Sequence, residues 1–240
     1  MNVVPPIRPV TVAGADGCPG GWVVVSATSA AGALEVQDVR VLPDFAALLE
    51  ATSGCAALSV DIPIGLAEDG ERRADYAARK RLGVPRSSSV FPCPARLLLA
   101  ASSYPEANAL SWSALGKGLA AQAFGIMAKI READACMSPE MQARVTETHP
   151  EVSFWALAGD EPMRHPKRKP EGRAERLRLL KGVFGPAVRS LVPPRGAAWD
   201  DLYDACVLAW TASHVAEGTA VHLPAEAQRD ARGLRMEIVY

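Results

Sequence analysis

The feature that most constrains the fold is a set of three apolar segments, separated by turn residues, near the start of the chain. The segments 10–15 and 22–27 flank a Pro-Gly-Gly turn, and two valine-rich runs joined in this way predict a β-hairpin. The third segment, 34–42, alternates apolar and polar residues and changes phase near Asp38, which predicts an edge strand with a β-bulge. The chain is therefore expected to open with three antiparallel strands.

A helix and a buried strand are expected to follow these three strands. Pro43 and Asp44 begin a helical pattern, and Gly54 ends it. Residues 56–62 form a short apolar run that fits a buried strand reached by a helical crossover. The resulting order, β-β-β-α-β, predicts an α/β protein with a mixed sheet.

Helical patterns dominate the rest of the sequence. They predict helices over 71–82 and 119–136, a strand over 144–148, a helix that begins at Pro150, and helices over 171–183 and 200–217. Residues 236–240 are expected to form a closing strand or a docked tail. We predict a single domain over residues 1–240, with a helical insertion at about 66–143.

Charge and composition limit the classes of protein. The chain has 26 Lys and Arg against 27 Asp and Glu, so a protein that coats nucleic acid nonspecifically is not expected. Its apolar runs are far shorter than the ~20 residues that span a membrane, and its amino terminus lacks the apolar core of a secretory signal. The five cysteines form no C-x-x-C pair. We expect a cytoplasmic protein with no membrane contact, reduced and mostly buried thiols, and no zinc site.

Four aspartates stand at the edges of apolar segments. Asp16 closes the first strand, Asp61 closes the buried strand, and Asp201 and Asp204 open the last helix, where their spacing gives them a shared face. Carboxylates at the ends of central strands are costly to desolvate unless a cation compensates them, and oxygen ligands suit Mg²⁺ or Mn²⁺. The four residues would hold two ions ~3.5 to 4 Å apart, the arrangement used for in-line phosphodiester cleavage.

Each of these acids also has a structural explanation. Asp16 fits a turn, and Asp61 precedes an Ile-Pro pair and fits a polar residue at a strand exit. Asp201 and Asp204 would complement the dipole of a helix that Asp200 caps. Both interpretations stay open for each residue taken alone, and it is their joint placement that favours a site.

Glu151 lies in the sequence Thr148-His149-Pro150-Glu151, which has two explanations. The threonine and the glutamate match a capping box, in which each exchanges a hydrogen bond with the backbone at a helix start. Alternatively, Glu151 is a catalytic ligand or base and His149 is a proton shuttle.

Basic residues gather in two stretches, at 72–86 and at 164–181. Such stretches are either solvated helix faces or surfaces that contact phosphate. Lys169 and Arg173 in the second stretch, and Lys117 in a Gly-Lys-Gly sequence, are candidates for phosphate contacts. The Gly-Lys-Gly sequence is not a P-loop, because it lacks the upstream glycine and the following Ser or Thr.

Eight short motifs occur in order over nearly the whole chain. They are GADGCPGGW (14–22), DIPIGL (61–66), SVFP (89–92), GKGL (116–119), KIREAD (129–134), HPEVSF (149–154), GRAER (172–176) and DDLYDA (200–205). These motifs resemble the domain-of-unknown-function 429 family, which is described as predicted nucleases with a ribonuclease-H-like fold. The resemblance implies that Asp16, Asp61, Asp201 and Asp204 occupy the acidic positions of that fold, and that Glu151 belongs to a family motif.

The sequence therefore favours a metal-dependent nuclease that acts on nucleic acid, with Mg²⁺ or Mn²⁺ bound by its carboxylates. Two alternatives belong to other classes. One is a phosphate- or nucleotide-binding protein or kinase of the actin-like ATPase type, because that fold also begins with an aspartate-glycine hairpin. The other is a non-catalytic member of the ribonuclease-H-like fold.

Overall fold

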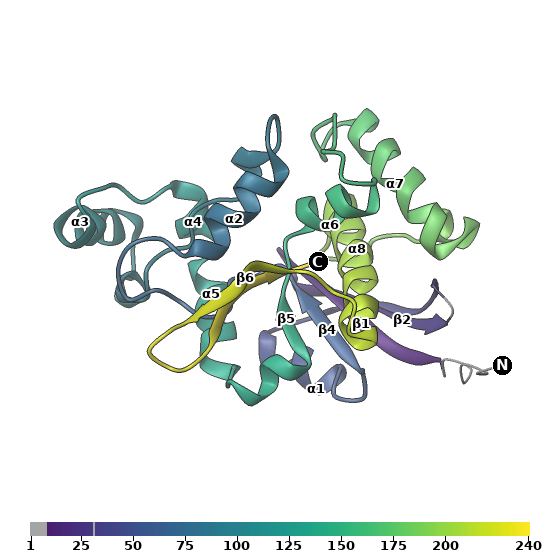
Figure 1. Ribbon diagram of the computed structural model, residues 1–240, viewed down its shortest axis with the longest axis horizontal. Helices are drawn as coiled ribbons and strands as arrows, with labels where there is room; N and C mark the ends of the chain where they lie inside the picture. The colour runs from purple at the N-terminus through teal and green to yellow at the C-terminus, as the bar shows by residue number, and fades with distance from the viewer. Residues whose placement is uncertain (1–8, 31) are drawn as a thin grey trace.

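The computed structural model describes residues 9–30 and 32–240, and its centre is a five-stranded mixed sheet of order β3-β2-β1-β4-β5 (Figure 1). The strands are β1 (Val10–Cys18), β2 (Gly21–Ala30), β3 (Ala33–Leu42), β4 (Ala57–Val60) and β5 (Val145–Glu147). β1, β2 and β3 pair antiparallel, whereas β4 and β5 continue the sheet parallel to β1. With α1 (Phe45–Ala51) between β3 and β4, the predicted β-β-β-α-β opening is confirmed, and so is the ribonuclease-H-like α/β fold class.

The antiparallel pairing extends β1 beyond the predicted segment, so that Asp16 lies within the strand and pairs with Val23. In the next pairing, Ser26 lies opposite Asp38 and Ala27 opposite Val36, which leaves Gln37 as an extra residue on β3. This is the β-bulge predicted from the change of phase, and it keeps apolar side chains of both halves of β3 against the core.

Helices fill the chain between β4 and β5 and again after β5. They are α2 (Arg73–Leu82), α3 (Tyr104–Leu115), α4 (Ala121–Gly125), α5 (Met127–Cys136), α6 (Pro150–Leu157), α7 (Pro170–Phe184) and α8 (Trp199–Glu217). Four short 3-10 helices lie at Ser87–Ser89, Arg96–Ala100, Glu140–Ala143 and Pro186–Ser190. The chain closes with a separate two-stranded sheet, β6 (His222–Arg229) and β7 (Arg235–Val239), so the expected closing strand is present.

The prediction of one helix over 119–136 is wrong. α4 ends at Gly125 and α5 begins at Met127; Ile126 between them caps both helices. Glycine is a poor helix former, and a break at this position turns the buried Ala123 and Met127 toward the cluster around Leu98. The pattern also missed α3, which Ser103 caps at its start and Gly116 ends in a left-handed conformation.

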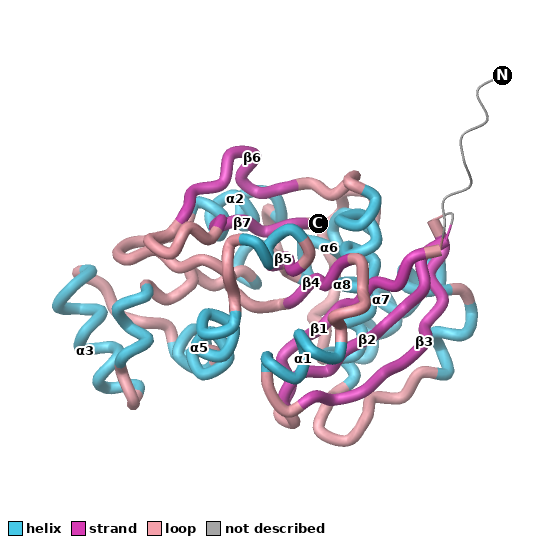
Figure 2. Tube along the Cα trace, turned by 90° about the horizontal axis from the view of Figure 1, so that it is seen from below, coloured by secondary structure: helices cyan, strands magenta, loops and turns pink. Residues whose placement is uncertain are grey.

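The two faces of the sheet carry different apolar cores. α8, with α6 and α7, covers one face, where Val12, Val23 and Val25 pack. α1 and α5 cover the other, where Phe45 and Ile130 pack. Figure 2 shows β1, β2 and β3 side by side, with α3 at the opposite end of the molecule.

Gly14 allows α8 to rest directly on β1. A Cβ atom at residue 14 would lie 2.1 Å from the backbone nitrogen of Ala209 and 2.2 Å from the carbonyl oxygen of Ala205. This close approach fixes the start of α8 beside the end of β1.

Two predictions concern the whole chain. The five cysteines are free thiols, and all but Cys136 are buried, as expected. Over the described ranges, no helix is both long enough and apolar enough to cross a membrane.

Candidate functional site

Asp16 and Asp61 lie side by side where two central parallel strands end. Ala15 of β1 pairs with Val60 of β4, and the amide of Asp61 donates a hydrogen bond to the carbonyl of Ala15 at 3.0 Å. Successive side chains of a strand point to opposite faces, so Asp16 points to the same face as Gly14, the face that α8 covers. Asp16 is buried and Asp61 is half-buried.

Asp204 reaches the same place from α8. It directly precedes Ala205, whose carbonyl lies over Gly14, and it is only 1% exposed. The close packing of α8 on β1 therefore brings a third carboxylate to the two strand ends. Asp16, Asp61 and Asp204 are called the acidic cluster below.

The acidic cluster behaves as one electrostatic unit. Burial raises the pKa of Asp16 well above its ordinary value, and the charges of Asp61 and Asp204 raise it further. Burial also raises the pKa of Asp61, against the opposing charge of His149. The pKa of Asp204 is raised to about 6, again mainly by burial. Each ionised carboxylate therefore makes ionisation of the others harder.

Lys167, in the connection between α6 and α7, places a cation against the acidic cluster. Its Nζ lies 2.5 Å from Oδ2 of Asp204. The charges of Asp204, Asp16 and Asp61 raise the pKa of Lys167, although its burial works in the opposite direction. In the sequence Lys167 was one basic residue among several in the 164–181 stretch, and no spacing signal separated it from its neighbours.

Glu151 lies at the start of α6, close enough to the acidic cluster to raise the pKa of Asp61 and of Asp204. One of its oxygens accepts a hydrogen bond from Nη2 of Arg176, a guanidinium that is only 1% exposed. The other, Oε2, is buried without a hydrogen-bond partner in the described part of the chain, with Nε of Arg86 4.0 Å away. Glu151 is thus held in place through one oxygen, while its other oxygen accepts no hydrogen bond from the described residues.

Of the two explanations for Glu151, the capping box with Thr148 is not the one that the structure shows. His149 is the N-cap of α6, and its Nδ1 accepts a hydrogen bond from the amide of Glu151 at 3.2 Å. Pro150, with its fixed backbone angle, takes the first helical position, so the helix starts one residue later than a threonine cap would require. His149 is therefore occupied in capping through Nδ1, while its Nε2 lies 3.3 Å from the carbonyl oxygen of Ser89.

Asp201 serves the helix rather than joining the acidic cluster through a direct contact. Its Oδ2 accepts a hydrogen bond from the amide of Ala198, the N-cap of α8, at 2.8 Å. Asp200 is not the cap; it pairs with the exposed Arg168. Asp201 still adds negative charge near Asp16, whose pKa it helps to raise.

The three candidates for phosphate contacts lie in different surroundings. Lys117 follows α3 and pairs with Glu71 in an exposed position. The guanidinium of Arg173 lies 3.5 Å from the ring centroid of Trp199. Lys169 is exposed at the start of α7, two residues after Lys167. Of the three, Lys169 is the one on the segment that leads to the acidic cluster.

The other basic stretch contains a buried ion cluster that sequence patterns did not reveal. Nη2 of Arg72 lies 2.5 Å from Oε1 of Glu147 and 2.6 Å from Oδ1 of Asp75. Burial raises the pKa of Glu147 to about 7, against the opposing charge of Arg72. Glu147 also accepts a hydrogen bond from the amide of Ile64, so this ion cluster fixes the segment that follows Asp61.

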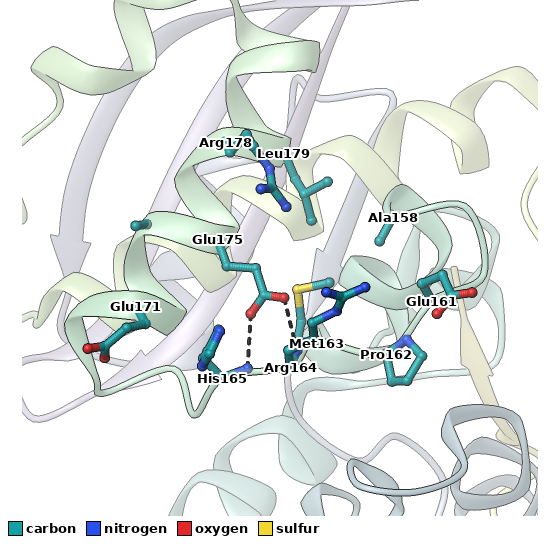
Figure 3. Close-up of a pocket in the computed structure, with 11 residues that line it drawn as sticks. Ala158, Glu161, Pro162, Met163, Arg164, His165, Glu171, Glu175, Arg178 and Leu179 are labelled. Carbon is teal, nitrogen blue, oxygen red and sulfur yellow. Dashed lines mark hydrogen bonds between the residues drawn. The ribbon is translucent and has the colours of Figure 1, made fainter.

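A cavity of about 820 Å³ lies between the α6–α7 connection and α7 (Figure 3). Its lining includes Glu161, Arg164, His165, Glu175 and Arg178. None of the acidic cluster lines it. The candidate chemistry therefore lies at the acidic cluster, and the cavity is lined by residues that hold the α6–α7 connection against α7.

The donor set fits a hydrated divalent cation. Within residues 9–30 and 32–240, no three His, Cys, Asp or Glu side chains meet closely enough to enclose a metal ion. Mg²⁺, however, keeps several waters and needs only one or two carboxylates from the protein. Oδ1 of Asp204 is buried without a hydrogen-bond partner in the described chain, and an orphaned oxygen of this kind suits an ion or its water.

The fold and these carboxylates define the class: a ribonuclease-H-like α/β protein with an acidic site at the ends of β1 and β4 and the start of α8. The family model described as "Protein of unknown function (DUF429)" matches residues 14–229, so the chain belongs to this family. No curated protein and no solved structure matches the chain.

Proposed function

We propose that the protein is a metal-dependent nuclease that hydrolyses phosphodiester bonds in nucleic acid. The observation that carries the proposal is the convergence of Asp16, Asp61 and Asp204, which come from the end of β1, the end of β4 and α8. Buried like charges raise one another's pKa and cost folding free energy, and carboxylates perturbed in this way cluster at functional sites. A bound Mg²⁺ or Mn²⁺ would neutralise the carboxylates and activate a water for attack on phosphorus.

The protein's own groups have separate roles in this proposal. Asp16 and Asp61 hold the ion. Glu151, oriented by Arg176, has one open oxygen with which to accept a proton from the attacking water. Lys169, at the start of α7, contacts the phosphate backbone of the substrate. The enzyme acts in the cytoplasm.

The test is cleavage by the purified chain with Mn²⁺ of single-stranded, duplex, hybrid and branched substrates. We expect cleavage of at least one substrate, and a loss of at least about 100-fold in Asp61→Asn, because a metal clamp is worth several kcal/mol of transition-state stabilisation. Asp69→Asn, which changes an exposed loop aspartate, is the matched control and should keep full activity.

Two outcomes would overturn the proposal. One is an intact panel of substrates under these conditions. The other is equal cleavage by the wild type and by Asp61→Asn, which would assign the activity to a contaminant. Stabilisation by a nucleotide together with an intact panel would favour the actin-like ATPase alternative instead.

A further inference from the structure

Lys167 is built into the acidic cluster rather than lying on a solvated face. Its side chain is 35% exposed, and its ammonium group contacts Oδ2 of Asp204, whose side chain is only 1% exposed. The charges of Asp16 and Asp61 act on it as well. The acidic cluster therefore already contains one positive charge, the ammonium group of Lys167.

The backbone on which Lys167 sits is anchored from two elements. Both oxygens of Glu175, on α7, accept hydrogen bonds from the amides of Arg164 and His165 at 2.9 and 3.1 Å (Figure 3). On the other side, Nε of Arg86 donates to the carbonyl of Met163 at 2.6 Å.

The first turn of α7 closes on the same segment. A Cβ atom at Gly172 would lie 2.1 Å from the carbonyl oxygen of Pro166, so the residue before Lys167 is in contact with the backbone of α7. Displacement of the backbone at Lys167 would break several of these contacts together. The fold thus fixes the backbone position from which the ammonium reaches Asp204.

The charge of the site matches a single divalent cation. Asp16, Asp61 and Asp204 carry three negative charges when ionised, and Lys167 carries one positive charge. Two negative charges remain, which one divalent ion balances. Two neighbouring acids lie outside this count. Glu151 is paired with Arg176, and Asp201 accepts a hydrogen bond from the amide of Ala198 at the start of α8, so its charge acts on Asp16 without a direct contact.

We propose that the site takes one divalent cation, on Asp16 and Asp61, and that Lys167 supplies the second positive charge in place of a second ion. Asp204 then joins the two: Oδ2 binds Lys167, and Oδ1, which is buried without a partner in the described residues, faces the ion or its water. This inference rests on the metal requirement of the proposed function.

The test counts bound ions without reference to activity. Mn²⁺ is titrated into the metal-free chain of 240 residues at pH 7.5, and free Mn²⁺ is measured by electron paramagnetic resonance. We expect one Mn²⁺ per wild-type chain. Lys167→Met should bind a second ion, or bind the first on the order of tenfold more tightly, because the variant lacks the ammonium group that repels a nearby cation. Lys167→Arg, which keeps the charge, should bind one ion like the wild type.

Lys181→Met is the matched control. It removes an exposed lysine from the last turn of α7 and should leave both the number and the affinity of bound ions unchanged. Two ions in the wild type, or an unchanged number and affinity in Lys167→Met, would overturn the inference while leaving the nuclease proposal intact. No Mn²⁺ binding at all would contradict both. If Lys167→Met does not fold, Lys167→Gln takes its place with the same expected result, and a count of two ions in the wild type still overturns the inference.

Discussion

The carboxyl group of Asp16 is held in the folded chain at a cost in free energy. It is 6% exposed, and burial together with Asp61 and Asp204 raises its pKa. Residues of this kind are kept for what they bind, and their removal is expected to stabilise the metal-free protein.

We predict that Asp16→Asn raises the melting temperature at pH 7 and has little effect at pH 4. A raised folded-state pKa gives stability that is present below the unfolded value, about 3.9, and is lost as the pH rises through the folded value. For Asp204 that folded value is about 6. Removing one charge from the acidic cluster should therefore stabilise the fold only at pH values above this range. There it should raise the free energy of unfolding by about 1 kcal/mol or more, which corresponds to ~2–4 °C in melting temperature.

Thermal unfolding in a chelator at pH 4, 5, 6 and 7 checks this prediction. Asp69→Asn, at an exposed position, should show no such trend. If Asp16→Asn gains the same number of degrees at every pH, packing rather than charge is the cause.

The contact between α8 and β1 decides whether the acidic cluster forms. Asp204 reaches the strand ends only because α8 touches the backbone of β1 at Gly14. The sequence of α8 predicts a helix with an apolar stripe, yet the stripe alone does not set how closely the helix approaches. A missing Cβ on the partner strand sets that distance.

Gly14→Ala is expected to destabilise the chain by at least about 3 kcal/mol, because backbone atoms of α8 would have to move away from the new methyl group. Gly182→Ala is the control: its Cβ meets nothing within 4 Å, and it lies in α7, where alanine should stabilise by up to about 1 kcal/mol. Urea unfolding of both variants measures the difference. A mild effect of Gly14→Ala would show that α8 is not seated on β1.

At the scale of the whole molecule, the closing β6–β7 pair ties distant parts of the chain together. The carboxylate of Asp230, in the turn between these strands, accepts hydrogen bonds from the amides of Leu66 and Leu234 and from Arg96. Leu66 belongs to the segment that follows Asp61, and Arg96 belongs to the helical region before β5. The end of the chain thus supports the position of one carboxylate of the site.

We predict that Asp230→Ala lowers the free energy of unfolding by at least about 2 kcal/mol, because it leaves buried donors without partners. Hydrogen exchange should speed up first over residues 62–101 and only later in β1, β2 and β3. Glu226→Ala, an exposed change on β6, should leave exchange unaltered. Uniform acceleration across the sheet would contradict a local supporting role for Asp230.

Local patterns were sufficient for the elements whose signals are local. Turn residues and alternation determined the three opening strands and the bulge beside Asp38, and helical periodicity determined α2, α7 and α8. They failed where an element depends on packing: the break at Ile126, and β6, whose polar sequence becomes a strand only by pairing with β7. The single-domain prediction for residues 1–240 remains a prediction.

By itself, the sequence determined the fold class and marked Asp16, Asp61 and Asp204, because strand ends and helix starts can be read from neighbouring residues. Only the tertiary structure decided that Lys167 stands among them, that Arg176 holds Glu151, and that Asp201 is engaged by a helix start. The physical reason is that burial and charge pairing depend on which distant segments pack together. The sequence identifies charged residues, but only packing determines which charges lose their water and must find a partner.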